Sequence, residues 1–561
     1  MSTDIEQGTA QGLDAETLGL MLQGLQEYLA DALPLDRQLE LDHEDICPED
    51  TVRAMSADLG IQLVFVPEAY GGMGGGAMDS YLLCEVMARK DIGLATAIFA
   101  TFLGSDPILV GATEEQKQRW LGAIAEEGIV FAYGATEPEA GSDLGAMKTR
   151  AVPIEAEDGT VTGYRISGAK QWISNGTIAD ATTILALTPA GPTWFVVEKD
   201  TPGFTSAKPE DKHGIRLSNT AALFLDNVEV PVEALIGGVE GRGLVQAQQV
   251  FGYTRVMVAA FGLGGGWEAV DRAIAYSKER VAGGSPLSEK QGYTHKLIVP
   301  HVARLEAARA FIEETALRID AGAGHDGALN TEGAIAKYLA TESGNRAAED
   351  AIQAHGGYGY TREYVVEKIK RDVRITTIYE GTSEILEMTI ARDRWQEHLK
   401  SRGGYYVAQA AELRALHATN PRVGADTAAL ALEALAGVFN ACQQGRLTRN
   451  QHVLFRLGEL VAHAECAGTM AKRAAAAADG TLHPKANRRF DADALATISR
   501  IFAREAAMKV GEEGLRWVAG SADPALGLDQ TLPATLRLDA IRASQAGLIA
   551  DMTALADVLY A

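Results

Sequence analysis

The spacing of apolar residues divides the chain into a helical, a β and a second helical stretch. Over the first 127 residues, apolar positions recur every three or four residues, which predicts helices. These helices are expected at 13–32, 50–60, 78–90, 92–110 and 113–127. Because the apolar run from residue 63 ends in Pro67 and a glycine cluster, residues 63–76 are expected to form an irregular loop.

Residues 128–236 alternate apolar and polar side chains, and turn residues separate the short runs. This pattern predicts an all-β sandwich or barrel. The helical spacing then returns, with helices expected at 242–280, 293–322, 329–356, 362–372 and 383–399. Further helices are expected at 405–417, 425–445, 449–479, 490–518 and 534–559, with a break at 479–485. The fold class is mainly α with a central β domain, and domains are expected at 1–129, 130–238, 239–400 and 401–561.

Charge narrows the possible functions. The formal net charge of −24 at pH 7 opposes binding to nucleic-acid phosphates or to an anionic membrane surface. Basic and acidic residues nearly balance over 401–561, so the negative charge lies mainly in the first 400 residues. The last segment therefore differs chemically from the rest of the chain.

The cysteines, Cys47, Cys84, Cys442 and Cys466, lack metal-ligand spacing, so we predict free thiols in a reducing compartment and no metal site. The first residues lack the features of a signal or transit peptide. No apolar run is expected to approach the length that spans a bilayer. These observations predict a cytoplasmic protein without a transmembrane segment.

A carboxylate in an apolar turn is the first candidate for chemistry. Glu380 follows Ile375, Ile378 and Tyr379 and precedes a Gly-Thr-Ser turn. Desolvation on one side makes a carboxylate a stronger proton acceptor, which suits a general base. The alternative is an exposed glutamate in an ordinary helix start, because Thr382 and Ser383 could cap the following helix.

Two polar stretches in the β region could hold a ligand. Residues 133–143 form a loop rich in hydroxyl and backbone N–H groups, which could bind an anion or the polar edge of a heterocycle, or could be a plain turn. Residues 170–176 place Trp172 in a strand, where it is either a core residue or the cover of a flat cofactor. The glycines at 262–266 lack a surrounding βαβ unit, so we predict a close helix–helix contact there.

Together, the 133–143 loop, the 170–176 strand and the run Tyr379-Glu380-Gly381-Thr382-Ser383-Glu384-Ile385 resemble the signatures of the acyl-CoA dehydrogenases, in their order and approximate separation. The upstream Gly-Gly-Tyr-Gly-Tyr at 356–360 is also typical of that family. The resemblance covers roughly residues 15–400. It implies a helical domain, a β domain and a four-helix bundle that bind FAD, with a helical extension after residue 400.

The resemblance also implies roles for individual residues. Glu380 resembles the catalytic base, and Trp172 would cover one face of the flavin. The residues that resemble cofactor contacts are Tyr133, Ala135, Thr136, Gly141, Ser142, Trp172, Ser174, Arg280, Gln353, Gly356, Gly357 and Thr382. Those that resemble substrate contacts are Ser142, Tyr253, Arg255, Tyr379 and Gly381.

The sequence departs from the family pattern at three places. Glu279-Arg280 is followed by Val281 to Pro286, without the aromatic residue that is usual in the family. The part of the FAD site that a neighbouring subunit would complete therefore lacks one of its usual residues. Gly252 stands where relatives often have an acidic residue. Thr254 occupies the position at which some relatives carry the base, and because it cannot act as one, the resemblance assigns the base to Glu380.

The implied reaction is α,β-dehydrogenation of an acyl-CoA thioester to a trans-2-enoyl-CoA. Glu380 would take the α-proton, flavin N5 would accept the hydride, and an electron-transferring flavoprotein would accept the electrons. The alternatives are an acyl-CoA oxidase that uses oxygen and a nucleic-acid-binding relative of the same fold. The extension resembles that of very-long-chain acyl-CoA dehydrogenases and implies a homodimer, with a tetramer or a membrane-docking surface as alternatives.

Overall fold

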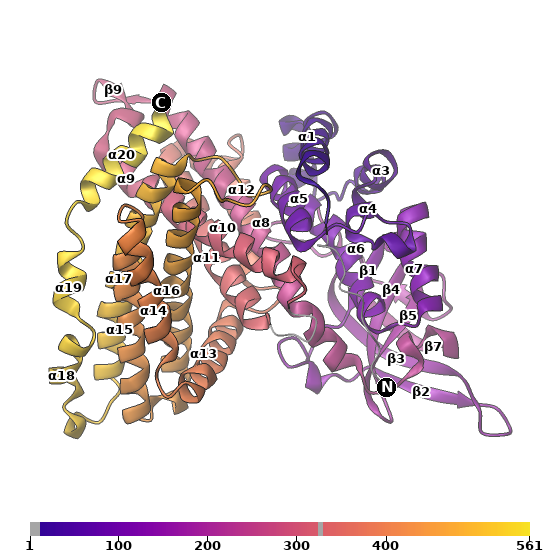
Figure 1. Ribbon diagram of the computed structural model, residues 1–561. Helices are drawn as coiled ribbons and strands as arrows, with labels where there is room; N and C mark the ends of the chain where they lie inside the picture. The colour runs from indigo at the N-terminus through magenta and orange to yellow at the C-terminus, as the bar shows by residue number, and fades with distance from the viewer. Residues whose placement is uncertain (1–11, 324–328) are drawn as a thin grey trace. The chain divides into compact units, whose positions relative to one another are not determined.

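The computed structural model describes residues 12–323 and 329–561, which form two compact units. The first unit comprises residues up to Met257 together with Ala316–Asn330, and the second comprises Val258–Thr315 and Thr331–Ala561. Figure 1 shows the order of helices and strands along the chain. The sequence of helical, β and helical regions agrees with the predicted fold class.

The first unit begins with a series of helices, one of which is apolar and mostly buried. They are α1 (Ala15–Ala32), α2 (Leu35–Glu44), α3 (Glu49–Leu59), α4 (Ile61–Phe65), α5 (Ala77–Lys90), α6 (Ile92–Gly111) and α7 (Glu114–Glu127). The side chain of Asp91 caps α6, and Phe99 and Phe102 on that helix are buried. Helix α2 was not predicted from the apolar spacing. The expectation that all of 63–76 is irregular is wrong at its start, where the end of α4 and a 3-10 turn at Glu68–Tyr70 lie.

The β region forms a seven-stranded sheet in the order β1-β4-β2-β3-β7-β6, with β5 paired to β4. The strands are β1 (Phe131–Gly134), β2 (Arg150–Glu155), β3 (Val161–Ser174), β4 (Ala181–Thr188), β5 (Gly191–Glu198), β6 (Phe204–Ser206) and β7 (Thr220–Pro231). Alternate positions of β3, β4, β5 and β7 supply its core, including Ile184, Phe195, Leu223 and Val228. The predicted period of two therefore has its expected cause, because alternate side chains point into one core.

Long helices carry the chain into the second unit. They are α8 (Gly243–Glu279), α9 (Gln291–Leu297), α10 (Val299–Asp320), α11 (Asn330–His355), α12 (Val366–Val373) and α13 (Ser383–Lys400). The helix expected at 293–322 is divided into α9 and α10 at Ile298, which has non-helical dihedrals. A Cβ on Gly262 would lie 2.7 Å from the Thr341 Cα, and one on Gly266 would lie 2.8 Å from the Gly344 Cα. These glycines let α8 approach α11, as predicted.

The C-terminal extension is a helical domain packed within the second unit. Its helices are α14 (Tyr405–Thr419), α15 (Ala425–Gln444), α16 (Gln451–Ala478), α17 (Ala492–Ala519), α18 (Leu528–Thr535), α19 (Leu538–Ala543) and α20 (Leu548–Tyr560). Helices α15, α16 and α17 pack against one another. The single helix expected at 534–559 is wrong, because the left-handed backbone of Arg537 and Gly547 divides this stretch into separate helices.

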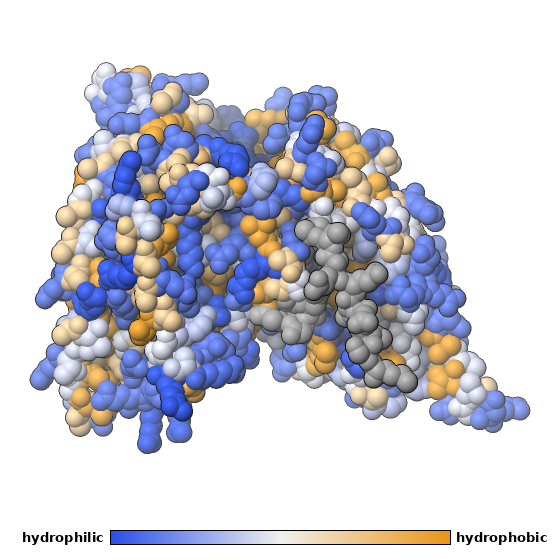
Figure 2. All heavy atoms as spheres, in the orientation of Figure 1, coloured by the Kyte–Doolittle hydropathy of each residue, from blue (hydrophilic) through white to orange (hydrophobic). Residues whose placement is uncertain are grey.

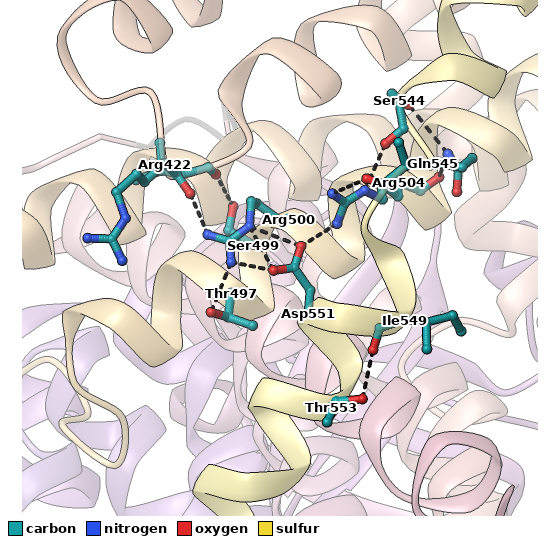
Figure 3. Close-up of polar contacts among 12 residues, drawn as sticks. Arg422, Thr497, Ser499, Arg500, Arg504, Ser544, Gln545, Ile549, Asp551 and Thr553 are labelled. Atoms are coloured by element: carbon teal, nitrogen blue, oxygen red, sulfur yellow. Dashed lines mark hydrogen bonds and ion pairs between the residues drawn. The ribbon is translucent and has the colours of Figure 1, made fainter. Parts of the chain in front are cut away.

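The last helix is fastened to α17 by a half-buried ion cluster (Figure 3). The Asp551 carboxylate accepts hydrogen bonds from Arg500 at 2.5 Å and from Arg504 at 2.6 Å. The same two arginines also donate to the Arg422 and Ser544 carbonyls. Burial alone would raise the pKa of Asp551, but the two guanidinium groups hold that pKa below its usual value. The ion cluster thus ties the chain end to the extension's long helices.

Two helices in the described part of the chain, α6 and α15, are long and apolar enough to cross a membrane, which corrects the expectation that no apolar run approaches this length. Within their most apolar windows, 89% and 83% of the residues are buried, as in the core helices of a globular protein. On the face shown in Figure 2, hydrophilic residues predominate and apolar ones are scattered among them. All four cysteines are free, and Cys84, Cys442 and Cys466 are buried.

Candidate functional site

The polar loop after β1 is fixed at its base. Strand β1 pairs in parallel with β4, and the Tyr133 ring lies 4.9 Å from the Trp194 ring. Beyond the strand, Ala135 is buried and Thr136 is half-buried. The Thr136 carbonyl accepts a hydrogen bond from the Gln171 amide at 2.9 Å, which joins the loop to β3. The first residues of the loop are thus held by the sheet.

The tip of the same loop is open. Glu137 and Ala140 exchange two backbone hydrogen bonds and close a tight turn. The next residues, Gly141 and Ser142, are exposed. A Cβ placed on Gly141 would meet no atom within 4 Å. The loop therefore offers accessible backbone and hydroxyl groups on a fixed base, which suits the binding of a polar ligand edge.

A buried ion pair under this loop was missed by the sequence analysis. The Lys170 ammonium, on β3, lies 2.7 Å from the Glu137 carboxylate. It also donates to the carbonyls of Ala135 at 3.3 Å and Leu185 at 2.6 Å. The Glu137 carboxylate accepts a further hydrogen bond from the Lys148 amide at 2.6 Å. A charged residue at an inward position of a strand is the one sequence signal that could have revealed this pair.

Burial and charge pairing act together on the ionisation of this pair. Burial lowers the pKa of Lys170 to about 8, although the Glu137 carboxylate opposes that shift. Burial alone would raise the pKa of Glu137, but Lys170 and the loop amides hold that pKa below its usual value. Both groups are therefore charged at neutral pH, and their attraction fixes the loop.

Trp172 stands out from the sheet instead of entering the core. The register between β3 and β7 shifts between Lys170 and Ile173, and Trp172 at this bulge has a left-handed φ of 61°. Its side chain is 62% exposed, so the core alternative for Trp172 is wrong. Two residues later, the half-buried Ser174 pairs with Thr220 at the end of β3. The indole and this hydroxyl are available to a ligand that contacts this end of the strand.

The α8 residues assigned to substrate contacts are engaged within the first unit. The Tyr253 hydroxyl donates to the Ser80 hydroxyl at 3.0 Å, and burial raises the pKa of Tyr253 above its usual range. Arg255 is buried and donates to the carboxamide and the backbone carbonyl of Asn330. Thr254 is fully buried. Any role of Arg255 toward a substrate would compete with these contacts.

The Glu380 turn lies in the second unit, between α12 and α13. A 3-10 turn at Arg374–Thr377 follows α12. Glu380 and Gly381 then take positive φ angles of 55° and 95°. A left-handed backbone costs a residue with a Cβ on the order of 1–2 kcal/mol, so surrounding contacts must hold this conformation. Glu380, Gly381 and Tyr379 are all half-buried.

Of the two residues that could cap the helix after Glu380, only Thr382 does so. The Thr382 side chain accepts a hydrogen bond from the Ile385 amide and caps α13. The Ser383 hydroxyl instead donates to the Glu342 carboxylate at 2.6 Å. Glu380 therefore lies two residues before a true helix cap, half-buried and not fully exposed. Its catalytic role stays a prediction.

A second group of assigned residues lies at the C-terminal end of α8. Arg280 is exposed, and its guanidinium carbon lies 5.7 Å from the centre of the Tyr358 ring. The exposed Gln353, Gly356 and Gly357 belong to the adjoining end of α11 and the 3-10 turn Gly356–Tyr360. A Cβ on either of these glycines would meet no atom within 4 Å. Their backbone is therefore open to a ligand.

The departure from the family pattern after Arg280 has a local cause. β8 (Val281–Ala282) and β9 (Ser285–Pro286) form a two-stranded hairpin. Gly283 and Gly284 connect them with φ angles of 59° and 87°. Two positive φ angles in a two-residue loop match the type I′ turn that short hairpins prefer. An aromatic ring near Arg280 is instead supplied by Tyr358, and close by Tyr276 stacks on His355 with ring centres 4.4 Å apart.

The assigned residues thus fall into two sets, one in each unit. The first unit holds Tyr133, Ala135, Thr136, Gly141, Ser142, Trp172, Ser174, Tyr253 and Arg255, and the second holds Arg280, Gln353, Gly356, Gly357, Tyr379, Glu380, Gly381 and Thr382. Among residues 12–323 and 329–561, no group of three or more histidine, cysteine or acidic side chains could hold a metal ion.

Comparison with known proteins identifies relatives along most of the chain. Family models for the N-terminal, middle and C-terminal domains of acyl-CoA dehydrogenases match residues 16–128, 132–228 and 241–394. The short-chain-specific acyl-CoA dehydrogenase of Megasphaera elsdenii is 38% identical over 355 residues, which cover 62% of this chain and 90% of that protein.

Two solved structures extend the comparison. An acyl-CoA dehydrogenase from Bacillus anthracis, complexed with FAD, is 24% identical and has a TM-score of 0.82, covering 100% of this chain and 98% of its own. That likeness shows the fold, including the extension. A chain from a structure of the electron transferring flavoprotein of Acidaminococcus fermentans is 33% identical, with a TM-score of 0.63 over 68% of this chain and 98% of its own.

Proposed function

The chain belongs to the acyl-CoA dehydrogenase family, and from that premise we propose that it uses FAD to convert an acyl-CoA thioester into its trans-2-enoyl-CoA. The substrate loses a proton from the α-carbon and a hydride from the β-carbon, and a double bond forms between these carbons. The observation that carries the proposal is Glu380, a half-buried carboxylate in a left-handed turn before the cap of α13.

Glu380 acts as the general base that takes the α-proton. A thioester α-proton becomes acidic only when its carbonyl oxygen is polarised, and donors aimed at the developing negative charge supply that effect. The backbone N–H of Glu380 is the donor that this chain offers by family analogy. The buried Thr254 cannot accept a proton at the alternative position on α8.

Side chains near the loop and strand ends of the first unit fit FAD. Trp172 offers a flat, exposed indole at a rigid bulge, and Ser142, Thr136 and Ser174 offer hydroxyls near loop and strand ends. When bound, FAD supplies the acceptor for the β-hydrogen. The family resemblance also assigns cofactor contacts to Tyr133, Ala135 and Gly141 in the first unit and to Thr382 in the second.

The edge formed by Arg280, Gln353, Gly356 and Gly357 suits the pyrophosphate and adenosine parts of FAD. Arg280 supplies an exposed cation, which matches a phosphate charge. The two glycines leave their backbone open to close approach. By family analogy this edge serves the FAD of a neighbouring subunit, so the site requires an oligomer, and we propose a homodimer in which the extension occupies part of the subunit surface.

The acyl-CoA contacts are assigned to Ser142, Tyr253, Arg255, Tyr379 and Gly381. Ser142 and Gly381 offer polar groups on irregular segments, and Tyr379 is half-buried beside Glu380. Tyr253 and Arg255 already contact Ser80 and Asn330. Tyr253 and Arg255 therefore shape the substrate site by fixing α8. Either side chain would contact the substrate directly only after its bond to Ser80 or Asn330 breaks.

We place the protein in the cytoplasm, because its four unpaired cysteines favour a reducing compartment. Electrons pass to an electron-transferring flavoprotein. The similarity to a chain in the Acidaminococcus fermentans structure supports this partner. An acyl-CoA oxidase is the competing function, and oxygen distinguishes the two. The purified protein should pass electrons to such a flavoprotein much faster than to oxygen, whereas rapid hydrogen peroxide formation would favour the oxidase.

The direct test uses the flavin as its own reporter. Purified protein should carry one FAD per chain or take it up on reconstitution. Under anaerobic conditions, a panel of acyl-CoA thioesters of different chain length should include at least one that bleaches the flavin absorbance. If the protein binds FAD but no thioester bleaches the flavin, the proposed reaction is wrong. Light scattering on the same sample measures the number of subunits and so tests the proposed homodimer.

A further inference from the structure

We propose that Lys337, on α11, is a positioning residue that holds the Glu380 turn in its reactive geometry, an inference that rests on the proposed function. Lys337 is fully buried, and its ammonium donates to the Gly381 carbonyl at 2.5 Å. That carbonyl belongs to the residue that follows the candidate base. Lys337 lies outside every motif that the sequence offers.

Helix α11 holds both sides of the segment that contains Glu380. Asn345 donates its carboxamide to the Val373 carbonyl at 2.9 Å, where α12 ends. Glu342 accepts the Ser383 hydroxyl at 2.6 Å, where α13 begins. Residues 337, 342 and 345 are spaced by five and three positions, which places them on neighbouring turns of the helix. Glu380 thus lies between two points that are fixed to the same rigid element.

The segment needs such fixation because its own backbone supplies little. Between α12 and α13 the chain has only a 3-10 turn and two consecutive residues with positive φ. A left-handed backbone at Glu380 is sparsely populated without outside contacts. The Lys337 bond fixes the orientation of the peptide that joins Gly381 to Thr382. It therefore restricts the backbone from which the Glu380 carboxylate projects.

The chemical identity of Lys337 supports this reading. A buried ammonium is costly to desolvate, and a methionine of similar length would fill the same space without that cost. The lysine donates to a carbonyl in an irregular segment. A carbonyl inside a regular helix accepts a backbone N–H of its own helix and needs no side-chain donor. Loss of this donor should let the turn relax, and a displacement of about 1 Å at a reacting group can lower the rate on the order of 10²-fold.

The experiment compares Lys337→Met with Lys337→Arg and with a matched control. Arg473→Met also removes a buried cation from the second unit, since Arg473 pairs with Glu313 and donates to the Asn487 carbonyl. Its partners Glu313 and Asn487 both lie outside the Glu380 segment. Each variant is measured for FAD content, thermal unfolding, the rate of flavin reduction from pH 6 to 9, and amide hydrogen exchange in residues 374–385 without substrate.

We expect Lys337→Met to retain FAD, to reduce its flavin about 10- to 100-fold more slowly, and to exchange the 374–385 amides faster. Its rate should also have a shifted pH profile, because a cation next to the turn is lost. Lys337→Arg should recover part of the rate, and Arg473→Met should lower thermal stability without changing local exchange or the pH profile. Parental exchange and a parental pH profile in Lys337→Met would overturn the proposal.

Two further measurements keep the test decisive. If Lys337→Met does not fold, Ser383→Ala removes the bond to Glu342 and should give a smaller effect of the same kind. A parental rate and parental exchange in that variant would then contradict the fixed-turn model. If no acyl-CoA reduces even the parent protein, the proposed function fails, while the exchange data still decide whether Lys337 orders the turn.

Discussion

The loop after β1 and the turn before α13 lie in different units, yet a buried lysine fixes each of them. Lys170 donates to the Ala135 and Leu185 carbonyls, and Lys337 donates to the Gly381 carbonyl. Both lysines are fully buried and project from a regular element, a strand in one unit and a helix in the other. Irregular segments that carry the candidate chemistry are thus held by side chains from rigid neighbours.

The two lysines hold their segments through different groups. Lys170 is paired with the Glu137 carboxylate, which belongs to the loop that it holds. Lys337 reaches a carbonyl one residue after the candidate base. The first arrangement therefore resembles a structural ion pair, whose loss should affect folding and ligand binding. The second should affect the rate more than the fold, and the following variants test this difference.

The largest effect is expected from Glu380→Gln, which keeps the shape of the side chain but cannot accept a proton. Loss of a general base typically lowers a rate on the order of 10²–10⁴-fold. FAD content should not change, because the assigned flavin contacts do not need this charge. Stopped-flow measurement of flavin reduction by an active acyl-CoA provides the test, and a near-parental rate would show that the base lies elsewhere.

Breaking the ion pair in the first unit should have the next largest effect. Lys170→Met leaves the Glu137 carboxylate buried without its partner, and such a loss typically costs about 3–5 kcal/mol of folding free energy. The loop should loosen, so affinity for FAD should fall as well. Denaturant unfolding and FAD titration measure the two consequences.

The double variant Glu137→Gln with Lys170→Met is the control for that prediction, because it leaves no uncompensated buried charge. It should recover a large part of the folding free energy lost in the single variant. Equal stability of the single variant and the parent protein would mean that the pair does not anchor the loop.

A buried acid on α13 predicts a pH effect in the second unit. Burial raises the pKa of Glu387 from 4.5 to about 7, while the Arg456 guanidinium, 3.6 Å away, opposes the shift. The folded state therefore binds more protons than the unfolded chain between pH 4.5 and 7. Its stability should fall as pH rises through that window, by roughly 1–3 kcal/mol.

Glu387→Gln removes that titration and tests the sign. The difference in unfolding free energy between pH 5 and pH 8 should be smaller in the variant than in the parent protein. The variant should therefore gain stability relative to the parent as the pH rises. An identical pH dependence in both proteins would exclude Glu387 as its source.

The smallest effect on folding is expected at Trp172. Because this side chain is 62% exposed, Trp172→Ala should change the folding free energy by less than about 0.5 kcal/mol. It should weaken FAD binding by about 3- to 10-fold, as expected for the loss of one aromatic contact. Trp194→Ala is the matched control, since Trp194 is 1% exposed and its loss should cost about 3–5 kcal/mol of folding free energy.

The sequence by itself determined the order of helical and β regions, because apolar spacing records which side of each element is buried. It also determined the close contact of α8 with α11, since only glycines at 262 and 266 leave room for the Thr341 and Gly344 backbone. Its joint motifs identified the family. Most helix ends followed the pattern, but the break between α19 and α20 depends on the backbone conformation of Gly547, which spacing does not encode.

Only the tertiary structure decided which lysines hold the segments of the candidate site. Lys170 and Lys337 lie far in sequence from most of the groups that they bind, so local patterns could not pair them with those groups. Its residue type favoured a core position for Trp172, but a bulge in β3 places the side chain at the surface. Periodicity reports the average environment of an element, whereas a bulge or a buried cation depends on the particular neighbour that folding brings beside it.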